Sequence, residues 1–217
     1  MKRPYFSIIL PTFNRGHLLP RAFQSVQSQD FQDWELIVVD DGSTDDTAQV
    51  IRNIQEKDPR VHLLMKPHQG LSKTRNLGVA FARGDYVTFI DSDDEYLRGH
   101  LAGHADYLRA HPDVDMLHGK VEVVGDPTVP DARDTSKTIA ITECTQPGTF
   151  FIRHSMIEAL GGFPEREFGE DSAFLELAQG SGYRVTLSPL KTYRYYNNEP
   201  DSLCNQLKAK NKGKGGS

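Results

Sequence analysis

The sequence has few cysteines, no long apolar run and no excess of positive charge. Two cysteines in 217 residues are too few for a disulfide framework, and two ordinary thiols in a reducing cytosol are favoured over a single bridge. No apolar run approaches the ~18 residues that span a bilayer, and no signal-peptide core follows the first residues. The formal net charge of -5 argues against a general nucleic-acid binder, which is usually basic.

What the sequence does have is the composition of a folded α/β domain. Hydrophobic residues make up 37% and charged residues 25%, so the bulk of the chain is not predicted to be disordered. Short apolar runs alternate with helical spacing over the first hundred residues, which predicts βαβ units and a mostly parallel sheet. The predicted strands are 6–10, 36–39, 61–65 and 86–90. Helices are predicted from Leu18, after a cap at Ser43 or Thr44, and from Leu71.

The pattern is less regular beyond residue 95. It predicts a helix over 96–110, a half-exposed strand over 116–124, a surface loop over 125–136, strands over 148–153 and 183–187, and a helix over 171–179. From Lys208 onward, four lysines alternate with small or polar residues, which predicts a flexible tail over 208–217.

Acidic residues follow two of the predicted strands. Asp40-Asp41 follows one strand, and Asp91-Ser92-Asp93-Asp94 follows another. Open parallel sheets bind ligands at the carboxyl ends of their strands, where crowded carboxylates need a cation or many donors. A plain turn explains Asp40-Asp41-Gly42 equally well. Three carboxylates in four positions exceed what a turn needs, and they suit Mg²⁺ or Mn²⁺, which would also hold a phosphate.

Five segments in order resemble the family-2 glycosyltransferases with the GT-A fold. They are "FSIILPTFNR" from Phe6, "WELIVVDDGSTDDT" from Trp34, "GLSKTRNLGVAFARGDYVTFIDSDD" from Gly70, "GGFPE" from Gly161 and "GEDSAFLELAQGSGYRV" from Gly169. The resemblance implies a Rossmann-like, mostly parallel sheet in a single domain over 1–207. Residues of about 5–95 would form a donor half, and 96–207 a smaller acceptor half.

The resemblance also implies an activity, the inverting transfer of a sugar from a nucleotide-sugar to a hydroxyl group with the help of a divalent metal. The expected donor is a UDP-sugar, and the expected acceptor is a glycan or glycolipid of cell-surface polysaccharide synthesis. A cytoplasmic protein is the corresponding expectation, with peripheral association at the inner face of the membrane left open. The residues implied in donor binding are Pro11, Thr12, Phe13, Asp40, Asp41, Arg75, Asp91 and Ser92.

The family pattern assigns particular roles to these positions. Phe13 would stack on the base, and Asp41, with or without Asp40, would accept the imide N–H of a uracil. Arg75 would bond the base carbonyl or a phosphate. The purely structural alternatives are that Phe13 is a loop aromatic packed on the core and that Arg75 is an exposed helix arginine.

The same pattern places the metal and the base. Asp93 would be the direct metal ligand, and Asp91 would share the metal or bond the ribose. Asp94 serves equally well as the N-cap of the helix predicted from Tyr96. Asp171 would be the general base and Glu170 would help to orient the acceptor, whereas both carboxylates could simply favour a helix start.

Three features depart from the family pattern or stand outside it. His68 replaces a frequent asparagine, and a surface histidine is the favoured interpretation. The run Tyr193-Arg194-Tyr195-Tyr196-Asn197 lacks the usual histidine, so Tyr196 or water would fill that place. His100 and His104 have zinc-like spacing but no third ligand, which favours a solvated helix face.

Two other functions compete with sugar transfer. A nucleotidyltransferase would need a Gly-rich, basic loop after the first strand, but Pro11–Gly16 contains one glycine and one charge. A catalytically inactive nucleotide-sugar-binding module is suggested by the altered run at Tyr193.

Overall fold

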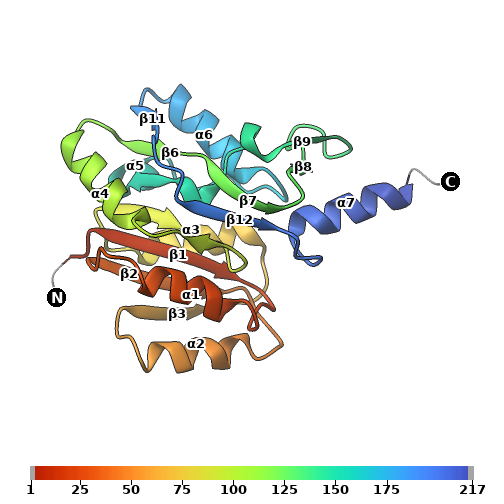
Figure 1. Cartoon of the computed structure of the whole chain (residues 1–217), viewed down its shortest axis with the longest axis horizontal. Helices are drawn as coiled ribbons and strands as arrows, with labels where there is room; N and C mark the ends of the chain where they lie inside the picture. Colours follow the sequence, from red (N-terminus) through yellow and green to blue (C-terminus); the bar gives the residue numbers. More distant parts are fainter. Residues whose placement is uncertain (1–2, 215–217) are drawn as a thin grey trace.

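A seven-stranded sheet runs through the computed structural model, which describes residues 3–214 (Figure 1). The strand order is β11-β6-β10-β4-β1-β2-β3, and β10 is the strand that runs antiparallel to its neighbours. The strands are β1 (Phe6–Thr12), β2 (Trp34–Asp40), β3 (Val61–Met65), β4 (Tyr86–Phe89), β6 (Met116–His118), β10 (Phe151–Arg153) and β11 (Val185–Leu187). The mostly parallel α/β sheet predicted from the sequence is therefore confirmed.

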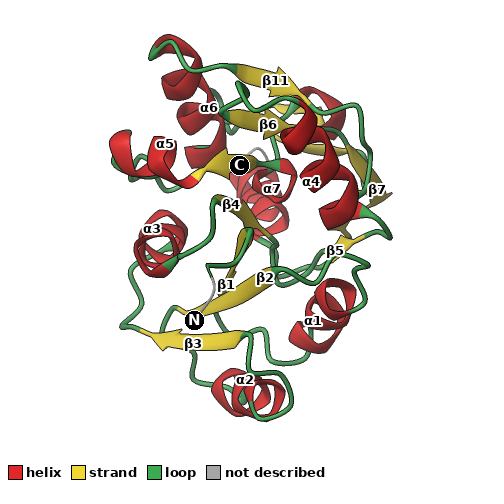
Figure 2. Ribbon diagram, turned by 90° about the vertical axis from the view of Figure 1, so that its left-hand side faces the viewer, coloured by secondary structure: helices red, strands yellow, loops and turns green. Residues whose placement is uncertain are grey.

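Helices cover both faces of the sheet, so its central strands are buried at every position. Figure 2 shows α3, α5 and α6 on one face and α1 and α4 on the other. Apolar side chains of both faces form two separate cores, which explains why β1 and β2 are apolar runs rather than alternating ones. The helices are α1 (Leu19–Gln27), α2 (Thr47–Gln55), α3 (Leu71–Phe81), α4 (His100–Ala110), α5 (His154–Ala159), α6 (Glu170–Gly180) and α7 (Leu203–Lys214).

Strand register brings three loops to one edge of the sheet. Thr12 at the end of β1 lies opposite Asp40 at the end of β2, and Ile9 of β1 lies opposite Phe89 at the end of β4. Because these strands are parallel, the segments that follow them leave the sheet at the same edge. The two acidic clusters therefore meet there.

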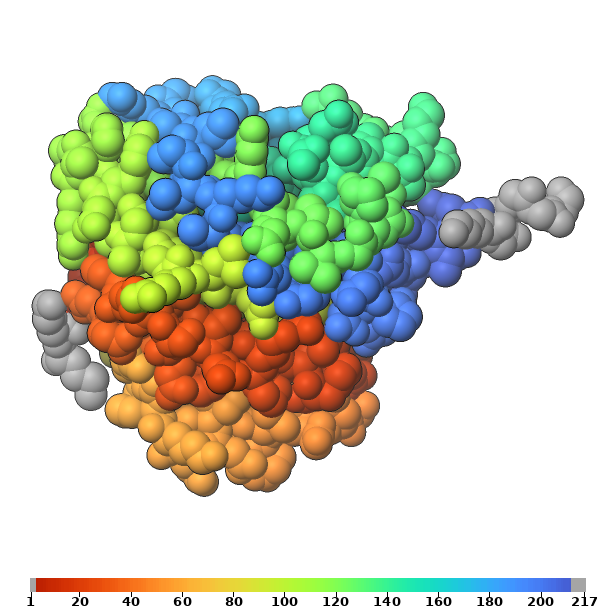
Figure 3. Space-filling view, viewed as in Figure 1, coloured from red at the N-terminus to blue at the C-terminus, as the bar shows by residue number. Residues whose placement is uncertain are grey.

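Smaller elements complete this edge. A three-stranded sheet has the order β5-β12-β7, and β8 pairs with β9. In Figure 3 the blue helix α7 lies beside the green and teal segment that contains this pair. These elements are β5 (Glu95–Tyr96), β7 (Val121–Gly125), β8 (Thr128–Pro130), β9 (Thr138–Ala140) and β12 (Tyr193–Asn197), with the 3₁₀ turns η1 (Ile141–Glu143) and η2 (Pro147–Thr149).

Several predicted boundaries were wrong. The helix expected from Tyr96 begins at His100, because Glu95 and Tyr96 pair with β12. The strand expected over 116–124 is two strands, β6 and β7, which join different sheets. Neither Ser43 nor Thr44 caps α2, which begins at Thr47.

The predicted flexible tail is also wrong for residues 208–214, which belong to α7. The Lys208 ammonium contacts Asp126 at 2.8 Å, and the Asn211 amide donates to the Thr135 carbonyl. The predicted tail residues 215–217 lie outside the described residues. None of the helices within residues 3–214 is long and apolar enough to cross a bilayer.

His100 and His104 do not form a solvated helix face. Both are buried, and the His104 ring bonds the His100 carbonyl and the Ser188 hydroxyl. Burial lowers the pKa of His104 to about 4, so it is neutral at pH 7. The pair is therefore part of the core under α4.

Candidate active site

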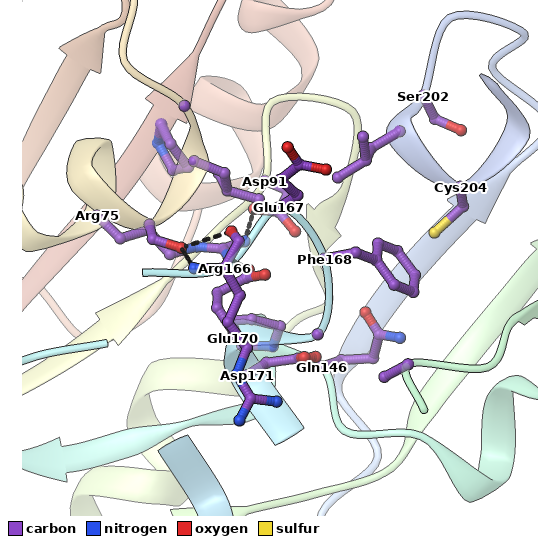
Figure 4. Close-up of a pocket in the computed structure, with 18 of the residues that line it drawn as sticks. Arg75, Asp91, Gln146, Arg166, Glu167, Phe168, Glu170, Asp171, Ser202 and Cys204 are labelled. Carbon is purple, nitrogen blue, oxygen red and sulfur yellow. Dashed lines mark hydrogen bonds and ion pairs between the residues drawn. The ribbon is translucent and has the colours of Figure 1, made fainter. Parts of the chain in front are cut away.

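One cavity of about 1290 Å³ lies at the carboxyl edge of the sheet. It is lined by the ends of β1, β2 and β4, the start of α3, the segment before α6 and the start of α7. Figure 4 shows Arg75, Asp91 and Glu170 on one side and Gln146, Phe168 and Cys204 on the other. The predicted site residues that line it are Pro11, Thr12, Phe13, Asp41, Arg75, Asp91, Ser92, Asp93, Glu170 and Asp171.

Asp41 is buried, and its carboxylate has hydrogen-bond and ion-pair partners within the protein. Its carboxylate accepts backbone N–H bonds of 2.9 Å from Gln69 and from Gly70, and it pairs with the Lys66 ammonium. Burial works to raise the pKa of Asp41, but the bonds from Lys66, Gln69 and Gly70 outweigh it and lower that pKa. Asp41 is therefore a fixed anion that ties the β2 end to the α3 start.

Asp40 differs from the other predicted residues because it does not line the cavity. It is fully buried, and its carboxylate accepts the Ser43 N–H at 2.9 Å. This geometry matches the plain-turn alternative. Gly42 continues the turn with φ of 81°, and a Cβ there would lie 2.8 Å from the His68 backbone nitrogen.

Phe13 and His68 form a stacked pair at the cavity wall. Their ring centroids are 4.2 Å apart, and the planes are inclined by 25°. Phe13 is 40% exposed, so the alternative of a core-packed aromatic is wrong. His68 is exposed as predicted, but its Nδ1 lies 2.9 Å from the Asp41 carboxylate. The two rings present an aromatic surface beside Asp41.

In the acidic segment after β4, the Asp93 carboxylate lacks the compensation that Asp41 has. Burial, followed by the nearby charge of Asp91, raises the pKa of Asp93 to about 6. The Asp93 carboxylate has a long contact of 3.5 Å to Nη1 of Arg15, which also pairs with Asp201, and the Arg21 guanidinium donates to the Asp93 backbone carbonyl rather than to its carboxylate. Asp93 is therefore crowded by Asp91 and lacks a close cation, whereas Asp91 pairs with the Arg75 guanidinium at 2.7 Å.

Asp94 is not a helix N-cap. It is fully buried and accepts hydrogen bonds from the Tyr193 hydroxyl at 2.7 Å and from the Tyr196 N–H at 2.8 Å. Tyr196 does not fill the place of the missing histidine, because its hydroxyl donates to Glu95 and its ring stacks under Arg21. Tyr195, the next residue toward the N-terminus, lines the cavity instead.

Arg75 joins the acidic segment after β4 to the first turn of α6. The exposed-arginine alternative is wrong, because the Arg75 side chain is 2% exposed. Its Nη2 donates to Asp91 at 2.7 Å, and its Nη1 pairs with Glu170. Burial works to lower the pKa of Arg75, but the negative charges of Asp91 and Glu170 outweigh burial and raise that pKa above its ordinary value. One permanently charged group thus bridges the β4 end and the first turn of α6.

Asp171 faces the cavity without such a partner. It lies in the first turn of α6, as the helix-start alternative also expected, and it hydrogen-bonds the Ser172 N–H at 2.7 Å. Burial, followed by the neighbouring Glu170 charge, raises the pKa of Asp171 to about 6. The turn into α6 needs Gly169 at φ 77°, where a Cβ would lie 2.6 Å from the Ala132 side chain.

Asp91 and Asp93 are the residues best suited to hold a metal. No group of three or more His, Cys, Asp or Glu side chains suited to a metal occurs within residues 3–214. Mg²⁺ in nucleotide enzymes commonly takes one or two carboxylates, with substrate phosphates and water completing the shell. Two crowded carboxylates at the cavity wall fit that chemistry.

Sequence reasoning missed two cations at the site. Lys66 directly follows the strand predicted at 61–65, so parallel register could have placed it beside Asp41. Arg15 follows the first strand, but the sequence pattern assigns it no separate role. Its contact with Asp201 joins segments 186 residues apart, for which the sequence gives no signal.

The fold and this cavity define the class of the protein, an α/β protein with the GT-A architecture. Solved structures agree. The chain aligns with TarS residues 1–349 of S. aureus in complex with UDP-GlcNAc at a TM-score of 0.74 and 28% identity, over 89% of this chain and 59% of that one. It also aligns with a mannosyltransferase of Pyrobaculum calidifontis in complex with GDP-Man and Mn²⁺ at a TM-score of 0.67 and 25% identity, over 90% and 57% of the two chains.

The family assignment follows from the sequence comparison. The model of glycosyl transferase family 2 matches residues 7–159, which is more than half of the chain, and the chain belongs to that family. It is 46% identical over 101 residues to the GalNAc(5)-diNAcBac-PP-undecaprenol beta-1,3-glucosyltransferase of Campylobacter jejuni. That match covers 46% of this chain and 33% of the relative, so the chain spans about a third of its length.

Proposed function

We propose that this chain transfers a sugar, with inversion, from a UDP-sugar to a hydroxyl group of a glycan or glycolipid acceptor, assisted by Mn²⁺ or Mg²⁺. The observation that carries the proposal is the single cavity that Asp41, Asp91 and Asp93 share with Asp171. Its volume of about 1290 Å³ exceeds the upper value of about 1,000 Å³ for common ligand pockets, so it has room for a donor and an acceptor together.

The donor would bind along the ends of β1, β2 and β4. The exposed ring pair of Phe13 and His68 gives the base a stacking surface, and Asp41 lies at its edge. Asp91 and Asp93 would hold the divalent ion, which neutralises charge on the departing diphosphate when it is bound. Similarity to a structure with bound UDP-GlcNAc supports a UDP-sugar, and similarity to one with Mn²⁺ supports the cation.

Asp171 is the proposed general base. The acceptor oxygen forms a bond to the anomeric carbon while its proton passes to the Asp171 carboxylate. The bond from that carbon to the diphosphate oxygen breaks, and its electron pair leaves with the nucleoside diphosphate. A carboxyl pKa of about 6 leaves Asp171 ionised at pH 7 and makes it a stronger base than an ordinary aspartate.

The acceptor would enter on the side lined by Phe168, Gln146 and Cys204. The Campylobacter relative is named for an undecaprenol-linked acceptor, which supports a glycolipid acceptor. Glu170 is held by Arg75, so it would fix the first turn of α6 and thereby orient Asp171.

A panel of UDP-sugars tests the proposal. With Mn²⁺ present, at least one should release UDP faster than its uncatalysed rate, and an acceptor glycan should accelerate that release. Pyrophosphate as the product would favour a nucleotidyltransferase instead. Binding of UDP-sugars without hydrolysis or transfer would favour an inactive binding module.

A further inference from the structure

Strand β12 is attached to the acidic segment through one tyrosine and one aspartate. The Tyr193 hydroxyl donates to Asp94 Oδ2 at 2.7 Å and accepts the Asp91 N–H at 3.2 Å. The other carboxylate oxygen of Asp94 accepts the Tyr196 N–H at 2.8 Å. Three hydrogen bonds thus join the strand to both ends of the segment Asp91–Asp94.

Packing leaves the Tyr193 ring little freedom. The residue is fully buried, and its ring contacts Tyr96 edge-on and lies against Gly148. A Cβ at Gly148 would lie 1.9 Å from a ring carbon, so only glycine lets the ring reach this place. The hydroxyl therefore has one position, from which it reaches both Asp91 and Asp94.

Asp94 itself has no place in the cavity. It does not line the cavity, whereas Asp91, Ser92 and Asp93 do. None of the ion pairs among residues 3–214 includes Asp94, and Tyr193 and Tyr196 supply its hydrogen bonds instead. A buried carboxylate held by neutral donors is costly, and its contacts point to the loop that it holds rather than to a ligand.

We infer that Asp94 and Tyr193 are positioning residues that fix the acidic segment so that Asp91 and Asp93 present their carboxylates to the cation. The inference rests on the proposed function. Like-charged side chains in one loop move apart unless the backbone is held, and partners that orient metal ligands commonly change metal affinity by about 10–100-fold. Tyr193 and Asp94 hold the backbone at Asp91 and at Asp94, on either side of Asp93.

The test compares Tyr193→Phe with Tyr196→Phe. Both variants lose one phenolic hydroxyl from β12, but the Tyr196 hydroxyl donates to Glu95, away from the cavity. UDP binding is measured by calorimetry over a series of Mn²⁺ concentrations and in EDTA. In Tyr193→Phe the Mn²⁺ concentration for half-maximal enhancement should rise about tenfold or more, with unchanged affinity in EDTA. Tyr196→Phe should match the wild type.

Asp94→Asn serves as a second variant, which also answers the question if Tyr193→Phe does not fold. It should raise the Mn²⁺ requirement in the same way, and the double variant should be no worse than the more affected single one. Unchanged Mn²⁺ dependence in either folded variant, or an equal shift in Tyr196→Phe, overturns the inference. Failure of the wild type to bind UDP under every condition would instead overturn the proposed function.

Discussion

The acidic clusters after β2 and after β4 look alike in the sequence but differ in their surroundings. Asp41 receives two backbone N–H bonds and a lysine, and its pKa is lowered. The Asp93 carboxylate pairs with Arg15 at the long distance of 3.5 Å, and its pKa is raised to about 6. The pKa of Asp171, across the cavity, is also raised. The comparison teaches that the Asp41 carboxylate is built into the fold, whereas Asp93 and Asp171 are buried with too few favourable contacts to offset that burial.

The largest effect should come from Asp171, the uncompensated carboxylate across the cavity. Asp171→Asn removes the proposed base but keeps the shape of the side chain. We expect transfer to fall by about 10²–10⁴-fold while UDP affinity stays the same. Steady-state kinetics and calorimetry measure the two quantities.

Asp106→Asn on α4 is the matched control, because Asp106 is exposed and does not line the cavity. It should leave transfer unchanged. Normal turnover by Asp171→Asn would show that another group takes the proton.

The pH dependence sharpens the same contrast. A base must be ionised, so kcat/KM should fall about tenfold per pH unit below the Asp171 pKa of about 6 and level off above it. The charged groups facing Asp171 are Glu170 and Arg75, and Arg75 does not titrate in this range. A profile that stays flat down to pH 4.5, with the protein folded, would contradict this assignment.

Stability without a cation should respond with opposite signs at the two clusters. Asp41→Asn breaks the Lys66 pair and sets an amide against backbone N–H groups, so it should lower the free energy of unfolding by about 1–3 kcal/mol. Asp93→Asn removes a crowded charge, so it should raise that free energy by about 1 kcal/mol. Urea unfolding at pH 8 in EDTA measures both. Destabilisation of similar size in both variants would remove the distinction between the clusters.

The smallest expected effect on ligand binding or turnover concerns the base-stacking surface. Phe13→Leu keeps an apolar side chain but removes the ring that stacks on His68. Base stacking on an aromatic side chain contributes about 1–3 kcal/mol, so UDP affinity should fall about fivefold or more. Phe81→Leu, an exposed aromatic on α3 outside the cavity, is the control. Equal affinities in all three proteins would place the base elsewhere.

The sequence predicted the parts of the fold that depend on local pattern. Apolar runs identified β1, β2 and β4, and their parallel order brought the acidic segments to one edge. It did not predict partners that are far apart in the chain. Arg75 and Glu170 are 95 residues apart, and Tyr193 and Asp94 are 99 residues apart. Such pairs depend on tertiary packing, which periodicity does not encode.

The errors around α4 and α7 have the same origin. Tyr96 has the local pattern of a helix start, but pairing with β12 makes it a strand. The lysine-rich composition from Lys208 favours a solvated tail, but Asp126, between β7 and β8, and Thr128, the first residue of β8, provide acceptors for Lys208. In both places a distant segment determined the structure, against the local preference.

The central claim is that the end of β4 uses Asp93 to bind a cation that holds a nucleoside diphosphate. The most direct measurement is the affinity for UDP of the wild type and of Asp93→Asn, each with Mn²⁺ and with EDTA. We predict that Mn²⁺ strengthens UDP binding tenfold or more in the wild type and has little effect in Asp93→Asn. Equal strengthening in both proteins, or no UDP binding by the wild type, would contradict the claim.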